Sequence, residues 1–279
     1  MTAPLLRRIP YDRLHIYYLE GQAGSAEESF DNRFIGNWEE DGDSFLFFSA
    51  PAEDDVRRYV AARSDLTLID QYDMTYEDWQ GGRFQGLRAG RLVVRPAWQD
   101  GPAAAPGEIP MQLDPGVVFG AGTHPTTQDC LTALAILSKD GPRGTLLDLG
   151  SGTGVLAVAA ARLGWRRVLA VDFNRLAVKT TCRNVALNGV ASRVLAVQGR
   201  AEELVACRAD VVVANIHYDV MRRLIQSPGF SRSRNGILSG LLRSQAREAE
   251  ALLTGAGMSI RRRWSRDNTW FTYLVSVYG

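Results

Sequence analysis

Residues 111–154 decide the fold of this chain, and they read MQLDPGVVFGAGTHPTTQDCLTALAILSKDGPRGTLLDLGSGTG. An apolar run at 145–149 leads into the glycine turn Gly150-Ser-Gly-Thr-Gly154. A strand that ends in such a turn and continues as a helix brings backbone close to a ligand, because side chains would block the approach. Such turns lie at the carboxyl ends of parallel strands, where open α/β sheets bind ligands. The stretch therefore predicts a ligand site on an α/β sheet.

The spacing of the glycines narrows the choice of ligand. The dinucleotide pattern G-x-G-x-x-G needs a third glycine where this chain has Val155, and no G-x-x-x-x-G-K-[ST] phosphate loop occurs. A dehydrogenase is therefore disfavoured. The next strand, 167–172, ends in Asp172, at about the twenty-residue spacing expected of a carboxylate that binds both ribose hydroxyls. The alternative for Asp172 is a cap on the following helix.

Composition sets the broad class of the protein. With 279 residues, a net charge of +1 and 46% hydrophobic residues, the chain suffices for one large or two modest domains. It contains no apolar run long enough for a membrane span and no signal-peptide pattern. Its cysteines and histidines are too scattered for a zinc site, another metal site or a disulfide framework; they are Cys130, Cys182, Cys207, His15, His124 and His217. We expect a cytoplasmic monomer without a metal.

The charge is distributed unevenly along the chain. Residues 1–110 contain 11 arginines and 19 acidic residues, a net charge of −8, and residues 111–279 carry a net charge of +9. An acidic front half disfavours direct nucleic-acid binding, which needs lysine and arginine. It favours a basic partner through electrostatic steering, although acids that merely solvate the surface explain the count equally well.

The front domain, residues 1–75, reads as a small α+β sandwich. Strands are predicted at 14–19, 34–38, 44–49 and 66–70, with a hairpin at Asp41-Gly-Asp43 and a helix from Pro51. The order suggests a ferredoxin-like arrangement whose first helix, between 21 and 33, is small or missing. Residues 76–110 read as a linker, in which 100–107 have the composition DGPAAAPG.

Residues 111–279 alternate strands with helices. Strands are predicted at 145–149, 167–172, 194–199, 209–215 and 236–239; helices are predicted at 154–163, 175–188, 220–226 and 242–255; a hairpin is predicted at 259–264 and 270–277. Continuous apolar strands such as 210–214 indicate a parallel sheet covered on both faces. The run Arg261-Arg-Arg263 is typical of a solvated strand edge, for which charges are protective, and less so of a phosphate site.

The motifs carry a resemblance to a known family. The glycine turn resembles motif I of Rossmann-like S-adenosylmethionine-dependent methyltransferases. Residues 113–127, LDPGVVFGAGTHPTT, are similar to the signature of the PrmA family, bacterial enzymes that methylate the large-subunit ribosomal protein eleven. Further similar motifs lie at 77–79, 91–100, 148–157, 184–190, 210–216 and 238–245. The resemblance implies a seven-stranded Rossmann-like methyltransferase sheet ending in one reversed strand, with a front domain similar to the family only in outline.

Carried over by position, the resemblance implies an S-adenosylmethionine site. The residues expected to bind the cofactor are Phe119, Thr126, Thr127, Gly150, Ser151, Gly152, Asp172, Phe173, Glu202 and Asn215. The two threonines would reach the methionine end of the cofactor from a helix that starts at Pro125, a residue suited to a first turn. Phe119 would pack on the cofactor. Glu202 would lie near the adenine or, equally, be an exposed helix acid.

The resemblance also gives Asn215 the catalytic role. Methyl transfer from a sulfonium is an in-line displacement with a good leaving group, so the enzyme must mainly hold a neutral amine in line. The carbonyl of Asn215 can accept a hydrogen bond from that amine, and desolvation lowers the pKa of an amine. No committed general base is visible. The family usually has a small apolar residue after Asn-Ile, and His217 and Tyr218 could line the acceptor site instead.

These residues predict a protein N-methyltransferase that acts on amino groups, lysine side chains or an N-terminus, of a basic large-subunit ribosomal protein. A rival within the same class is a lysine methyltransferase of another protein, such as the β subunit of electron-transfer flavoprotein. A rival from another class is a non-catalytic adaptor that binds S-adenosylmethionine.

Overall fold

The computed structural model describes residues 9–99, 104–139 and 143–277. They form two compact units, each treated by itself. Among the described residues, the front unit comprises 9–84 together with 174–176, and the back unit comprises those from 85 to 173 and from 177 to 277. Residues 100–103, half of the stretch expected to be a linker on composition, lie outside the described residues.

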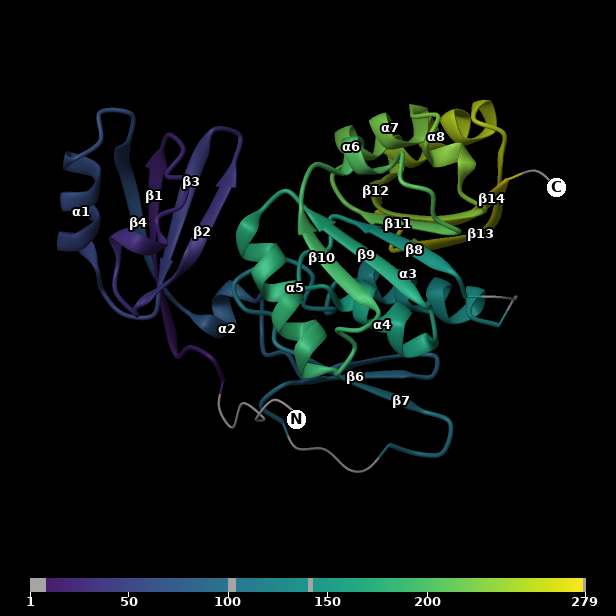
Figure 1. The fold of residues 1–279 in the computed structure, drawn as a ribbon, viewed down its shortest axis with the longest axis horizontal. Helices are drawn as coiled ribbons and strands as arrows, with labels where there is room; N and C mark the ends of the chain where they lie inside the picture. Colours follow the sequence, from purple (N-terminus) through teal and green to yellow (C-terminus); the bar gives the residue numbers. More distant parts are fainter. Residues whose placement is uncertain (1–8, 100–103, 140–142, 278–279) are drawn as a thin grey trace. The chain divides into compact units, whose positions relative to one another are not determined.

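The front unit is a four-stranded antiparallel sheet with one helix. Its strands are β1 (Arg13–Glu20), β2 (Phe34–Glu40), β3 (Asp43–Phe48) and β4 (Thr67–Thr75), in the order β2-β3-β1-β4. Helix α1 (Glu53–Ala61) covers one face (Figure 1). This order confirms the ferredoxin-like prediction. The core on the α1 side contains Tyr17, Leu19, Phe48 and Val56.

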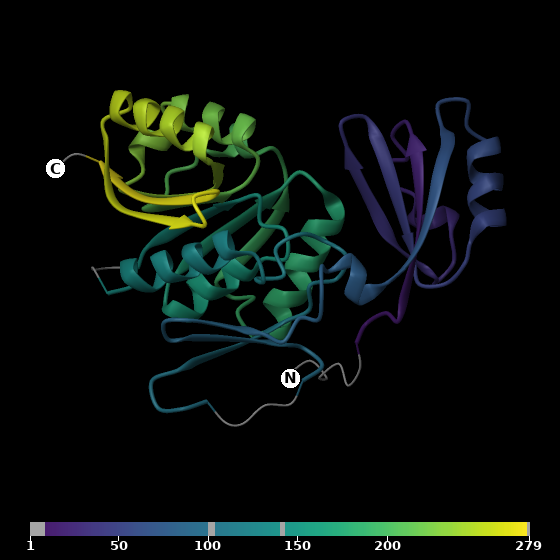
Figure 2. The ribbon, with the colours of Figure 1, turned by 180° about the vertical axis from the view of Figure 1, so that it is seen from behind.

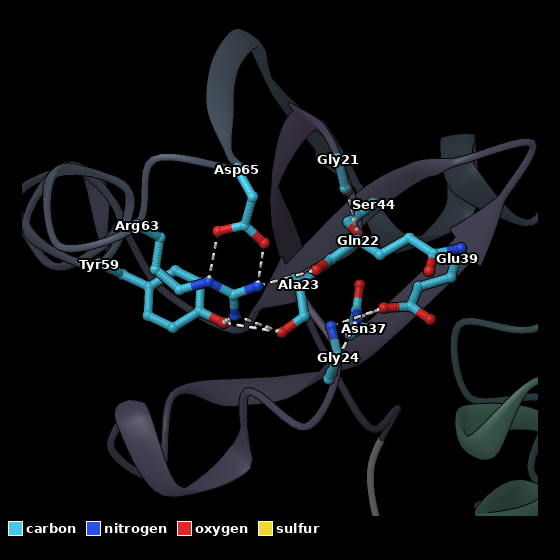
Figure 3. Close-up of polar contacts among 10 residues, drawn as sticks. All are labelled: Gly21, Gln22, Ala23, Gly24, Asn37, Glu39, Ser44, Tyr59, Arg63 and Asp65. Carbon is cyan, nitrogen blue, oxygen red and sulfur yellow. Dashed lines mark hydrogen bonds and ion pairs between the residues drawn. The ribbon is translucent and has the colours of Figure 1, made fainter.

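A pinned loop replaces the first helix of this arrangement, which is reduced to the 3-10 turn η1 (Glu27–Ser29), as the sequence predicted. Figure 3 shows how polar side chains hold the loop before η1. Ser44 Oγ accepts from the amide of Ala23 and donates to the carbonyl of Gly21, both at 2.8 Å. Arg63 donates to the carbonyls of Ala23 at 3.0 Å and Gln22 at 3.1 Å. The loop therefore covers the sheet without helical hydrogen bonds of its own.

We expect Arg63→Ala to loosen this loop, because two carbonyls lose a charged donor. The cost should be about 1–3 kcal/mol, and hydrogen exchange at amides 21–26 measures it. The matched control is Arg57→Ala on α1, the helix that ends two residues before Arg63; the ion pair of Arg57 with Glu53 joins side chains 62% and 44% exposed and should contribute little. Equal exchange in both variants would contradict the role of Arg63.

The back unit is built on a seven-stranded sheet in the order β10-β9-β8-β11-β12-β14-β13. Its strands are β8 (Thr145–Leu149), β9 (Arg167–Asp172), β10 (Val194–Gln198), β11 (Val211–Asn215), β12 (Asn235–Leu242), β13 (Met258–Arg266) and β14 (Trp270–Val277). The first five strands of that order are parallel, and β14 runs antiparallel to both of its neighbours. The Rossmann-like sheet with one reversed strand is thereby confirmed.

Helices cover both faces of this sheet (Figure 1). One face carries α3 (Pro125–Leu137), α4 (Val155–Leu163) and α5 (Arg175–Leu187); the other carries α6 (Ala201–Leu204), α7 (Tyr218–Gln226) and α8 (Arg243–Gly255). The second face buries a core in which Leu147 and Leu149 of β8 pack with Met221 and Leu253 of the helices. The apolar strands of the parallel sheet are therefore covered by helices on both faces, as parallel sheets require.

Residues 76–110, expected as a linker, contain regular structure. They form α2 (Tyr76–Trp79), β5 (Leu87–Ala89) and β6 (Leu92–Pro96), and β7 (Ile109–Leu113) completes a three-stranded sheet. β5 contacts α3 and β7 contacts α4, so the small sheet lies on the side of these helices away from the large sheet (Figure 2). None of the helices in the described ranges has the length and apolar character that a membrane span needs.

Candidate functional site

The glycine turn between β8 and α4 is folded tightly onto its neighbours. Gly150, Gly152 and Gly154 have φ of 76°, 52° and 76°, a region that L side chains rarely adopt. A Cβ on Gly152 would lie 2.6 Å from the carbonyl oxygen of Phe119, and one on Gly150 would overlap the side chain of Ile216. The turn therefore needs glycine both for its angles and for space.

Asp172 binds the turn from the end of β9. Its side chain is 6% exposed, and its Oδ2 accepts a hydrogen bond from the amide of Gly152 at 2.9 Å. The amides of Gly150 and Ser151 donate to the carbonyl of Val171 at 2.8 and 3.0 Å. Asp172, which the sequence predicted as a ribose-binding carboxylate, is thus held against the glycine turn.

The glycine-rich segment at 116–122 lies directly on the turn. Thr153 donates its amide to the carbonyl of Phe119 at 3.2 Å and its hydroxyl to the carbonyl of Gly120 at 2.7 Å. The side chain of Phe119 remains 69% exposed. An exposed aromatic ring beside a glycine turn offers an apolar surface to a ligand.

The start of α3 meets the end of β11. His124 is the N-cap, with its Nδ1 2.7 Å from the hydroxyl of Thr126, and Pro125 is the first helical residue. Thr126 and Thr127 are buried in the first turn, which confirms the predicted helix start. Asn215 donates from Nδ2 to the hydroxyl of Thr127 at 3.4 Å. Two residues 88 positions apart, both selected from sequence, are thereby brought together.

The end of β12 contributes two residues that were not predicted for the site. Ser239 donates to the carbonyl of Thr126 at 3.4 Å. Gly240 has φ of 86°, and a Cβ there would lie 3.2 Å from Oδ1 of Asn215. The signal was present, since Ser-Gly follows a predicted parallel strand and the carboxyl ends of such strands meet at one edge.

Asp148 on β8 is a further residue that sequence reasoning missed. It is fully buried, and neither carboxylate oxygen accepts a well-formed hydrogen bond. Burial raises the pKa of Asp148 to about 7; the nearby amide of Ala157 lowers it and the charge of Asp172 raises it further. An uncompensated buried carboxylate favours a cation nearby.

We expect Asp148→Asn to change the pH dependence of stability. The raised pKa means that the folded protein holds a proton between about pH 4 and 7 that the unfolded chain has lost, so the wild-type protein loses stability as pH rises through that window. The asparagine of the variant carries no titrating proton, so the free energy of unfolding of the variant should not fall over this window. At pH 8 it should exceed that of wild type by up to a few kcal/mol more than it does at pH 5. Urea unfolding at pH 5 and pH 8 measures the difference; a pH-independent difference would refute the assignment.

The remaining predicted residues lie at the same edge but with different contacts. Phe173 is 52% exposed directly after Asp172. Glu202, on α6, lies 3.4 Å from Nε of Arg223 on α7. Its place near an adenine stays a prediction, and so does that of Phe173. The described ranges contain no cluster of three or more histidine, cysteine or acidic residues that could hold a metal.

His217 and Tyr218, which could both have lined the acceptor site, differ sharply. The side chain of His217 is 85% exposed, with Nδ1 4.0 Å from Asp219. Tyr218 is 7% exposed and belongs to the core beneath α7 and α8, where burial and Glu248 raise the pKa of its hydroxyl to about 12. Tyr218 is therefore a packing residue, and only His217 remains available to an acceptor.

Comparison with known proteins identifies the family of this site. The family model described as "Ribosomal protein L11 methyltransferase (PrmA)" matches residues 55–276. The chain belongs to the PrmA family. A family member from Pelotomaculum thermopropionicum is 42% identical over 71% of this chain and 65% of its own length, and one from Desulforamulus reducens is 37% identical over 77% and 70%. The chain thus spans just under two thirds of the first of these relatives.

A solved structure agrees with the family assignment. A ribosomal protein L11 methylase from Lactobacillus delbrueckii subsp. bulgaricus is 28% identical, with a TM-score of 0.59 over 70% of this chain and 100% of its own. The PrmA match includes all of β8, β9 and β11, the strands whose ends carry the glycine turn, Asp172 and Asn215.

Proposed function

We propose that this protein is an S-adenosylmethionine-dependent N-methyltransferase that modifies amino groups of a large-subunit ribosomal protein. The observation that carries the proposal is the meeting of Thr127 and Asn215 beside a glycine turn held by Asp172. Three segments far apart in sequence converge on one edge of the sheet, in a member of a family named for this reaction.

The residues present fit this cofactor. The glycine turn presents no bulky side chain of its own, and the exposed rings of Phe119 and Phe173 beside it offer apolar surface to an adenine. The buried carboxylate of Asp172 is held against the turn by the amide of Gly152. A negative charge there suits S-adenosylmethionine, which carries a sulfonium and an ammonium, better than a phosphate group.

When bound, the cofactor supplies an electrophilic methyl group on a good leaving group. The work of the protein is then to hold and orient the acceptor. Thr127 accepts the amide hydrogen of Asn215, which leaves the carbonyl oxygen of Asn215 directed elsewhere. Gly240 keeps space beside that oxygen, since a Cβ there would lie 3.2 Å away. An amine in that space would donate to the carbonyl and keep its lone pair for the methyl group.

The substrate is proposed from the family and from charge. The relatives are named as methyltransferases of ribosomal protein L11. The net charge of −8 over residues 1–110 suits a basic protein through long-range attraction. We propose lysine side chains or an N-terminus as the acceptors, in the cytoplasm where ribosomes are assembled, with the protein acting as a monomer.

Labelled methyl transfer tests the substrate. Purified protein is incubated with methyl-labelled S-adenosylmethionine and either dissociated large-subunit proteins or a ribosome-free lysate. We expect label in one ribosomal protein. Label found only in a lysate protein, such as an electron-transfer flavoprotein β subunit, would show that the substrate is that protein and not a ribosomal one. Cofactor binding without transfer to any acceptor would favour an adaptor.

A further inference from the structure

Two asparagines, one on α5 and one directly after its last residue, stand out because the predicted catalytic and cofactor set does not include them. They belong to the motif Asn184-x-x-x-Asn188. Asn184 is 0% exposed, although a buried carboxamide costs free energy unless all its hydrogen bonds are made. The groups that its hydrogen bonds join therefore indicate its role.

The two carboxamides bind the free edge of β7 as a neighbouring strand would. Asn184 accepts from the amide of Asp114 and donates to its carbonyl, both at 2.8 Å. Asn188 accepts from the amide of Gln112 at 2.9 Å and donates to its carbonyl at 2.7 Å. The spacing matches, since four residues of helix rise about 6 Å and two residues of strand about 6.6 Å.

Asn184 also reaches the glycine turn. Its Nδ2 donates to the carbonyl of Thr153 at 2.8 Å, so one side chain joins the turn to the segment that enters the site. The carboxylate of Asp114, 1% exposed, continues the link, because it accepts from the amide of Gly116 at 3.0 Å and pairs with Arg183 at 3.1 Å. The chain then runs only a few residues to Phe119.

We propose that Asn184 is a positioning residue of the cofactor site, which fixes the 116–122 segment on the glycine turn and so sets the place of Phe119. The inference rests on the proposed function, since S-adenosylmethionine is taken as the ligand. Asn184 touches neither the cofactor nor the acceptor; it acts through the segment. Asn188 binds the same strand one helical turn later and helps to position the same segment, but it makes no bond to the glycine turn.

A double-mutant cycle with calorimetric titration of S-adenosylmethionine tests the inference. Asn184→Ala leaves buried backbone groups of Asp114 and Thr153 without partners and should weaken affinity about tenfold or more. In a Phe119→Ala background the same change should have little further effect, because coupled residues are non-additive. Cys182→Ala, an exposed position on the same helix, is the matched control and should leave affinity unchanged.

Hydrogen exchange gives a second readout that general destabilisation would not produce. Amides 117–122 should exchange faster in Asn184→Ala, while those of β12 should keep their wild-type rates. Asn188→Ala loses the two bonds to Gln112 and the one to the carbonyl of Asn184, but none to the glycine turn. It should therefore show the same pattern more weakly, and it replaces Asn184→Ala in the double-mutant cycle if that variant does not fold. Additive effects of Asn184 and Phe119, or a lower melting temperature with unchanged affinity, would overturn the proposal. Wild-type protein that does not bind S-adenosylmethionine would instead overturn the proposed function.

Discussion

Asp172→Ala should abolish measurable binding of S-adenosylmethionine. The carboxylate is 6% exposed and already oriented by the amide of Gly152, so it can accept from ribose hydroxyls at little cost in ordering. Loss of two charge-assisted bonds should weaken affinity by about a hundredfold or more. Isothermal titration calorimetry measures this affinity.

The controls for Asp172 separate binding from folding. Asp172→Asn keeps an oxygen for the amide of Gly152 and should give an intermediate affinity with a normal melting temperature. Glu203→Ala removes an exposed acid from α6 in the same unit and should bind like wild type. Wild-type affinity in Asp172→Ala would remove this residue from the site.

Asn215→Ala should keep cofactor affinity within a few-fold and lose turnover. Its side chain is set by Thr127 and by the space at Gly240, at the opposite side of the glycine turn from Asp172. If the carbonyl aims the acceptor amine, its loss should lower kcat by about a hundredfold or more. Single-turnover transfer and calorimetry, performed on the same preparation, test the separation.

The conservative variant of Asn215 makes the test sharper. Asn215→Asp keeps an oxygen for the amine and should retain more activity than alanine. The negative charge of the aspartate raises the pKa of a bound amine. The methyl-transfer rate of this variant should therefore keep increasing up to a higher pH than the rate of wild type does. Equal losses of cofactor affinity in Asp172→Ala and Asn215→Ala would refute the separate roles.

The sequence predicted the elements whose pattern is local. The turn at Asp41 and Gly42, with φ of 53° and 96°, lies where the hairpin was expected, and the first helix is reduced as its short polar segment indicated. The parallel strands of the back unit were visible because continuous apolar runs alternate with helical periodicity. Local propensity and tertiary context agree in these elements.

The small sheet was not predicted, for a physical reason. β5 and β6 have three and five residues, and the connection from β6 to β7 has a composition typical of linkers. Short strands give almost no periodic signal. The small sheet is stabilised by the tertiary contacts of β5 with α3 and of β7 with α4, which the local sequence does not encode.

For two side chains of the site region, the sequence pattern already contained the information that the structure gives. Tyr218 shares its helix face with Met221, Leu224 and Ile225, and all four are buried; this three-to-four spacing already indicates a core position. Asp148 is a charged residue in a strand expected to be buried on both faces, which is unusual without a functional reason. The meeting of Thr127 with Asn215, by contrast, depends on the sheet order, which only the structure gives.

The central claim is that this chain transfers methyl groups from S-adenosylmethionine to a ribosomal protein through the site at Asp172 and Asn215. The most direct measurement is the intact mass of purified ribosomal protein L11, unmodified at the start, after incubation with cofactor and either wild type or Asn215→Ala. We predict a mass increase in whole methyl steps with wild type and almost none with the variant. No increase with wild type that binds the cofactor, or an equal increase with both proteins, would contradict the account.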